Sequence, residues 1–187
     1  MNRDDAKRTI AANEVKKLSD SDKLKILENN YWCFEDKEDI TESIEKRSFP
    51  RVSESFIELI CKTTNPILTE ESEILLIDNE INSLEFVSNS YLEAKLRIIN
   101  PNSNNIVSGE EEKAGLCPCC EHYSIDYGED GLWDICPVCF WENGGDGPNH
   151  MSLEEAKLNF IKLGAMSERS LEFIDKEGKL KYKKYTE

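Results

Sequence analysis

Apolar residues recur at helical spacing through the first hundred residues of the chain. Ser19 is placed to cap one of the predicted helices, and Ser88, Asn89 or Ser90 is placed to cap another over residues 91–99. The earlier helices are defined by Ala11, Val15, Leu18, Leu24, Leu27, Tyr31, Phe56, Ile57, Ile60 and Cys61. Residues 1–100 are therefore expected to form a mainly helical domain.

Two segments of this part have patterns that do not decide their structure. Residues 36–46 are acidic and polar, which fits a loop or an exposed helix. Residues 74–77 form a short apolar run that fits a strand or a helix equally well. A polar stretch rich in Asn and Ser then interrupts the periodicity, and residues 101–113 are predicted to be a linker between two domains.

Residues 114–187 have a different pattern. Tyr123, Ile125 and Tyr127 alternate with other residues as in a strand, residues 128–131 form a turn, and residues 132–135 return as a second strand, to which residues 140–142 can add a third. Ser152 and Glu155 form a capping box that opens a helix ending at Gly164. The apolar face of that helix (Leu153, Ala156, Phe160 and Leu163) is expected to cover Trp133, Phe140 or Trp141.

Two C-x2-C pairs flank the predicted hairpin, fifteen residues apart: Cys117 with Cys120, and Cys136 with Cys139. This spacing is typical of a closed structural zinc site, in which four thiolates surround the ion at about 2.3 Å. The predicted fold is therefore α+β, with the mainly helical domain followed by a small zinc-ribbon hairpin and a packed helix. Such a short ribbon needs metal because it buries too little apolar surface to be stable alone.

Other interpretations of the cysteines are weaker. A redox C-x-x-C pair belongs in a thioredoxin-like βαβ context, whereas these pairs flank a hairpin. Cys119 could replace Cys120 as a ligand, but the first pair would then shrink to C-x-C, and His122 is a further substitute ligand. Cys33 and Cys61 have no second ligand nearby in the sequence and are expected to be buried small hydrophobic residues.

The number of cysteines and the sequence of the N-terminus indicate the cellular compartment of the protein. An odd number of cysteines argues against a fully paired disulfide framework. No signal peptide is visible, and no apolar run is long enough to span a bilayer. We therefore expect a cytoplasmic protein, in which cysteines stay reduced and serve for metal binding or packing.

The formal net charge of -15 narrows the range of partners. Proteins that bind nucleic acid or anionic membranes need a basic face to contact the phosphate groups. Residues 114–156 contain no Lys or Arg, so neither kind of partner is expected for this segment. The acidic balance favours a basic protein partner, although it also fits a protein that is merely kept in solution by its charge.

The C-terminal third also resembles a known family. Its residues 117–120 (CPCC), 134–142 (DICPVCFWE) and 147–160 (GPNHMSLEEAKLNF) resemble the bacterial cysteine-rich CPCC family in order and spacing. The resemblance implies a cysteine-ligated zinc module and carries no established activity. This chain departs from the usual zinc knuckle at Glu121, where a glycine is common.

No catalytic constellation is found, since a zinc closed by four thiolates leaves no position for water and no known catalytic motif is present. The expected function is therefore binding rather than catalysis. One hypothesis is an immunity-type protein that neutralises a basic toxin, such as a nuclease. The alternative is a housekeeping or regulatory zinc module with another protein partner.

Overall fold

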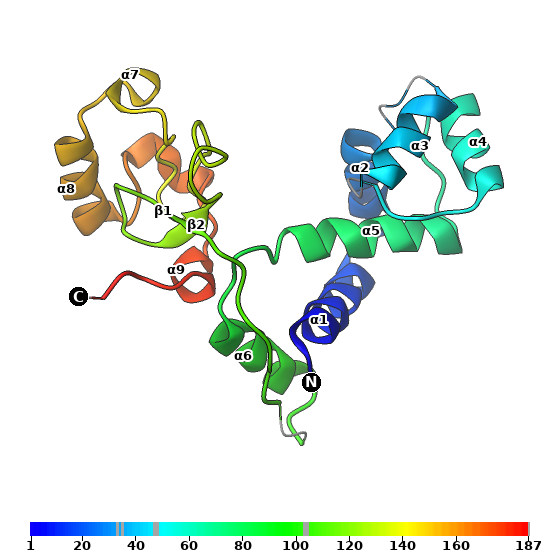
Figure 1. Ribbon diagram of the computed structural model, residues 1–187, viewed down its shortest axis with the longest axis horizontal. Coiled ribbons are helices and arrows are strands. Elements are labelled where there is room, and N and C mark those ends of the chain that lie inside the picture. The colour runs from blue at the N-terminus through cyan, green and yellow to red at the C-terminus, as the bar shows by residue number, and fades with distance from the viewer. Residues whose placement is uncertain (33, 35, 47–48, 103–104, 187) are drawn as a thin grey trace. The chain divides into compact units, whose positions relative to one another are not determined.

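The computed structural model describes residues 1–32, 34, 36–46, 49–102 and 105–186. Within them the chain forms nine α-helices and one two-stranded antiparallel sheet next to the cysteine cluster, which confirms the predicted α+β class (Figure 1). The fold divides into two compact units. One contains residues 4–84, and the other combines residues 1–3 with residues 85–187.

The unit of residues 4–84 is helical. Its helices are α1 (Arg3–Lys17), α2 (Asp20–Asn30), α3 (Lys37–Glu45), α4 (Glu54–Lys62) and α5 (Glu70–Asn82). Four of them begin at a side chain that accepts a hydrogen bond from a backbone amide of the first turn, and these caps are Ser19, Asp36, Ser53 and Thr69. The core consists of Val15, Leu27, Tyr31, Ile40, Phe49, Phe56, Ile57, Ile60, Leu75 and Leu76.

Both ambiguous segments of this unit are helical. Residues 37–45 form α3 because Asp36 caps it and Ile40 is buried in the core. The apolar run at 74–77 lies inside α5, where Leu75 and Leu76 are buried while Ile74 is exposed. Cys61 is only half-buried, so its predicted burial is wrong, and Cys33 lies outside the described residues.

The second unit carries α6 (Asn89–Ile99), β1 (Gly115–Leu116), β2 (Tyr123–Ile125), α7 (Asp146–Asn149), α8 (Leu153–Leu163), a 3-10 helix (Glu168–Glu172) and α9 (Gly178–Lys181). Ser88 caps α6, and Ser152 caps α8, which ends at Gly164 with a left-handed φ of 84°. These caps agree with the predicted helix starts. Helix α6 joins the C-terminal segment through Lys95, whose ammonium donates to Glu177 at 2.7 Å.

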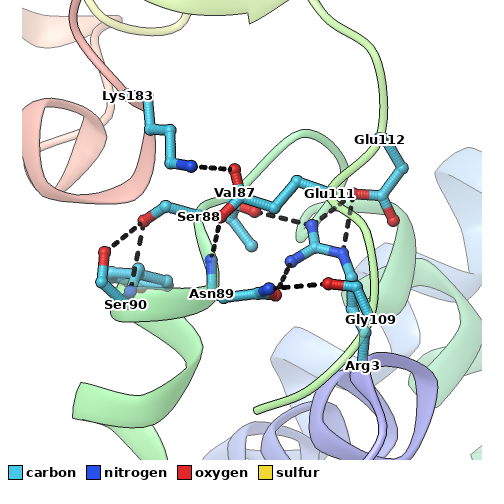
Figure 2. A network of polar contacts seen from close by, with 10 residues as sticks. Arg3, Val87, Ser88, Asn89, Ser90, Gly109, Glu111, Glu112 and Lys183 are labelled. Atoms are coloured by element: carbon cyan, nitrogen blue, oxygen red, sulfur yellow. Dashed lines mark hydrogen bonds and ion pairs between the residues drawn. The ribbon is translucent and has the colours of Figure 1, made fainter.

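The first three residues of the chain belong to this unit and fasten its predicted linker. The amino group of Met1 donates to the carbonyl of Ile106 at 3.1 Å, and the amide of Ser108 donates to the carbonyl of Met1 at 3.0 Å. The Arg3 guanidinium is buried and donates to Glu112, to the Val87 carbonyl at 2.6 Å and to the Asn89 side chain at 2.7 Å (Figure 2). The segment from 105 to 112 is therefore irregular, and hydrogen bonds and an ion pair with Met1 and Arg3 hold it in place.

The carboxylate of Glu111 links the same network to the start of α6. It accepts from the backbone amide of Asn89 at 2.8 Å and pairs with the ammonium of Lys183 at 2.8 Å (Figure 2). An acidic group at a helix N-terminus is stabilising because the first amides lack partners within the helix. The predicted domains, residues 1–100 and 114–187 with the linker between them, remain a prediction about independent folding.

Candidate metal centre

Four cysteines converge in the second unit. The sulfurs of Cys117, Cys120, Cys136 and Cys139 all lie within 4.8 Å of one another, and all four residues are buried. The Cys117 and Cys139 sulfurs are 3.6 Å apart, and those of Cys120 and Cys136 are 3.5 Å apart. The structure thus brings together the four ligands predicted from the sequence, while their role as ligands stays a prediction.

The two C-x2-C turns are built in the same way. In the first knuckle (residues 117–122), the amide of Glu121 donates to the Cys117 carbonyl at 3.0 Å, and the Cys117 amide donates to the His122 carbonyl at 2.9 Å. In the second knuckle (residues 136–141), the amide of Phe140 donates to the Cys136 carbonyl at 2.8 Å, and the Cys136 amide donates to the Trp141 carbonyl at 2.9 Å. Each turn therefore holds its two sulfurs on one side by backbone bonds alone.

The residue after each second cysteine has a left-handed backbone. Glu121 has φ of 61° and Phe140 has φ of 68°. Glycine adopts this conformation without strain, whereas other residues pay about 1–2 kcal/mol. The missing glycine noted at Glu121 therefore leaves the turn intact but strained, and Phe140 repeats the same departure in the second knuckle.

Replacing Glu121 by glycine is expected to stabilise the protein. The Glu121 side chain is exposed, so Glu121→Gly removes little packing, and relief of the left-handed strain is expected to raise the free energy of unfolding by about 0.5–1 kcal/mol after the extra chain entropy of glycine. Thermal melting of the metal-loaded protein measures the gain. The control is Glu154→Gly in helix α8, which is expected to lower the melting temperature; a fall for Glu121→Gly as well would contradict the strain argument.

The strand pairing differs from the predicted hairpin. Strand β2 pairs with β1, which precedes the first knuckle, and Ile135 forms an isolated antiparallel bridge with Glu142 across the second knuckle. Residues 128–133 are turns, so they do not form the predicted returning strand. The alternation of Tyr123, Ile125 and Tyr127 correctly predicted a strand, which forms β2 over Tyr123–Ile125, but its predicted partner at residues 132–135 is wrong. Each knuckle closes its own small loop, and this local closure replaces pairing between the two knuckles.

Polar groups near the cluster are directed at its sulfurs and carbonyls. The Ser124 hydroxyl lies 3.1 Å from the Cys136 sulfur, and the Val138 amide donates to the same sulfur at 3.4 Å. Nδ1 of the buried His122 lies 2.9 Å from the Cys120 carbonyl oxygen. In the part of the chain that the structure describes, the group of side chains placed to hold a metal includes neither His122 nor Cys119.

The thiols are electrostatically coupled before any metal is considered. Burial acts to raise the pKa of the Cys136 thiol, but hydrogen bonds from Cys117, Cys120 and Cys139 outweigh burial and lower that pKa. Hydrogen bonds with Cys117, Cys119, Cys120 and Cys136, together with burial, raise the pKa of Cys139. Contacts inside the cluster thus shift the pKa values of its thiols in opposite directions.

The donor set fits a metal ion. Four sulfurs at about 2.3 Å from a tetrahedral ion lie roughly 3.8 Å from one another. The separations of 3.6 Å and 3.5 Å within the cluster are close to this value. Buried thiols of this kind are poorly solvated, and a cation that neutralises their thiolates removes the cost of ionising them. The cluster is accordingly compatible with metal binding.

The segment after the second knuckle covers it. The amide of Met166 donates to the Cys139 carbonyl at 2.8 Å, the amide of Asp175 donates to the Pro137 carbonyl at 2.8 Å, and the Phe140 ring stacks on Phe173 with centroids 5.2 Å apart. A side chain at Gly178 would press on the Val138 backbone at 3.3 Å. Sequence reasoning missed this cover, because residues 165–178 have no helical or strand periodicity that could indicate it.

Helix α8 buries little of its predicted apolar face. Of its predicted apolar face only Ala156 is buried, and Phe160 meets the ring of His122 beside the first knuckle. Trp141 is buried and Phe140 lies under Phe173, while Trp133 is 58% exposed. Of the three aromatic residues that α8 was expected to cover, Trp133 is therefore excluded, and cover of Phe140 or Trp141 by α8 stays a prediction.

Comparison with known proteins supports the resemblance seen in the sequence. The family model described as Cysteine-rich CPCC matches residues 115–179, the C-terminal part of the chain that contains both knuckles and their cover. The searches of curated proteins and of solved structures gave no match. None of the helices in the described ranges has the length and apolar character needed to cross a membrane.

Proposed function

We propose that the four cysteines hold a structural zinc ion and that the protein acts in the cytoplasm by binding and neutralising a basic protein, a nuclease toxin. The observation that carries this proposal is a buried four-thiol cluster in a segment, residues 114–156, that has nine acidic residues and no Lys or Arg. Zinc is the metal that such a closed set of four thiolates generally selects.

The zinc is structural in this proposal. Bound zinc would supply the stability that this unit's small sheet cannot supply alone. Cys117, Cys120, Cys136 and Cys139 would occupy all four tetrahedral positions, which leaves none for an activated water or a substrate. The protein is accordingly proposed to be a binding protein and not an enzyme.

The acidic balance supports the choice of partner. Nuclease toxins carry basic clefts because they hold phosphate backbones, and a rigid acidic protein can fill such a cleft in place of nucleic acid. The same charges would repel nucleic acid and anionic membranes, so neither is proposed as a partner. Zinc bound to four thiolates adds a further formal charge of about minus two.

The partner is expected to associate quickly at low salt and slowly at high salt. Complementary charges speed encounter by about 10 to 1,000-fold, and salt screens them over roughly 8 Å at physiological ionic strength. The test is capture from the native cells on the zinc-loaded full chain. Association kinetics are then measured between about 50 and about 500 mM salt, a range over which the screening length falls about threefold.

Recovery of a basic nuclease whose activity the protein inhibits, with association that falls at least about tenfold over this range, supports the proposal. An acidic partner, a nucleic acid, or association indifferent to salt contradicts it. A basic partner from a core cellular process with no toxic activity would favour the alternative, a regulatory zinc module.

A further inference from the structure

Trp133 is held in an unusual conformation on the surface of the second unit. Its side chain is 58% exposed, and its backbone has φ of 76°, a left-handed conformation that is rare for a bulky residue. Leu132 and Ile135, on the same loop, are 53% and 50% exposed. Three large apolar side chains within four residues thus face solvent, where polar residues are more usual.

The loop fixes this conformation from several sides. The Trp133 amide donates to the Asn143 carbonyl at 3.3 Å, and the Asn143 amide and side chain donate to the carbonyls of Asp134 and Gly131, both at 2.8 Å. The indole lies on Gly144, where an added Cβ would come within 2.3 Å of two ring carbons. The ring is therefore positioned by a glycine that leaves room for it.

The buried Asn149 secures the other side of the same loop. Its side-chain amide donates to the Glu142 carbonyl at 2.8 Å and to the Gly145 carbonyl at 2.7 Å, and its side-chain oxygen accepts from the Glu142 amide at 2.9 Å. Segments 131–135 and 142–149 consequently form one braced unit beside Cys136. An aromatic side chain that is already ordered loses little entropy on binding, which is the property of an interface anchor.

The charges around this loop define the kind of partner. Glu129, Asp130, Asp134 and Glu142 flank the apolar residues in sequence, and no Lys or Arg occurs between residues 114 and 156. Apolar anchors within an acidic rim complement a basic surface that offers an apolar recess. Nucleic acid would be repelled here, and a second copy of the chain would bring the same acidic rim against itself.

We infer that Leu132, Trp133 and Ile135 form the docking surface for a basic protein partner, with Trp133 as its anchor. This inference rests on the proposed function and adds the location of the interface. It assigns binding to the metal-braced loop of the second unit rather than to the acidic helices of residues 4–84.

Site-specific photo-crosslinking in the native cells tests the location. A benzophenone amino acid replaces Leu132 in the full chain, with matched probes at Ile161 on α8 and at Glu73 on α5, both exposed. We expect an adduct with a basic protein from position 132 and none from the two control positions. An adduct from position 161 or 73 but none from 132 overturns the inference and leaves the proposed function standing.

A failure of the proposed function has a different signature in the same experiment. No adduct from any of the three positions, or an adduct with an acidic protein or a nucleic acid, contradicts the proposed function and this inference together. An adduct with a basic protein from all three positions also overturns the inference, because it shows a contact that is not confined to this loop.

Two further variants examine the anchor itself. Trp133→Gly suits the left-handed backbone and removes only the ring, and it is expected to lower the adduct yield from position 132 at least about tenfold. Gly144→Ala keeps the ring but displaces it and is expected to lower the yield less. Both should retain their metal, measured per chain, which shows that the loop still folds; an unchanged yield in Trp133→Gly overturns the role of the anchor.

Discussion

The variant Cys136→Ser is expected to lose nearly all of its zinc and to unfold the second unit around both knuckles. Cys136 is a buried member of the cluster of four sulfurs, and its sulfur accepts a hydrogen bond from the Val138 amide at 3.4 Å and lies 3.1 Å from the Ser124 hydroxyl. A serine hydroxyl does not ionise at neutral pH and is a poor replacement for a thiolate. Because metal binding is folding free energy in small zinc units, of order 10 kcal/mol, the loss exceeds that of any single packing contact.

Cys119→Ser is the matched control. Cys119 is buried in the same turn but lies outside the group of four sulfurs, so this variant is expected to keep one zinc per chain. Metal analysis and near-ultraviolet circular dichroism of the two purified variants provide the comparison. If Cys119→Ser loses zinc while Cys120→Ser keeps it, the ligand set derived from the C-x2-C spacing is wrong.

Removal of the metal by a chelator is expected to unfold residues 114–187 and to leave helices α1 to α5 folded. The unit of residues 4–84 has its own apolar core and its own helix caps, and none of these involves a cysteine of the cluster. Most helical circular dichroism should therefore survive chelation, and hydrogen exchange should stay slow in α2, α4 and α5. Complete loss of the helical signal would show one cooperative unit and contradict this expectation.

The hydrogen-exchange protection of helix α6 after chelation shows where the boundary between the two domains lies. A boundary at residues 101–113 predicts that α6 stays protected with the N-terminal helices. However, Lys95 and Tyr91 of α6 bond to Glu177, and the Ser88 amide donates to the Lys181 carbonyl at 2.8 Å. If α6 loses protection together with residues 114–187, these contacts place it with the metal-dependent part.

Local chemistry explains what could be predicted from the sequence. The helices over residues 3–30, 54–62 and 89–99 follow from apolar periodicity and from caps such as Ser19 and Ser88, which act within one turn of their own position. The cluster of four cysteines follows from spacing alone, because a C-x2-C turn orients its two sulfurs by backbone bonds inside six residues. Such features need no knowledge of the rest of the chain.

Features that depend on distant segments could not be predicted in the same way. Arg3 meets Glu112 across more than a hundred residues, and Gly178 lies against Val138, yet neither pairing leaves a periodic signal. The hairpin between the knuckles was wrong because an alternating pattern indicates a strand but not its partner. A large aromatic residue such as Trp133 is expected in the core from its residue type. Only the structure shows that its side chain is exposed and that its backbone is left-handed.

The proposed function depends above all on a zinc ion bound by Cys117, Cys120, Cys136 and Cys139 and by no other group. X-ray absorption at the zinc edge, on protein whose metal content has been measured, tests it most directly. We expect one zinc per chain with four sulfur neighbours at about 2.3 Å. A protein that holds no zinc when supplied with it, or a first shell containing nitrogen or oxygen, would contradict this ligand set.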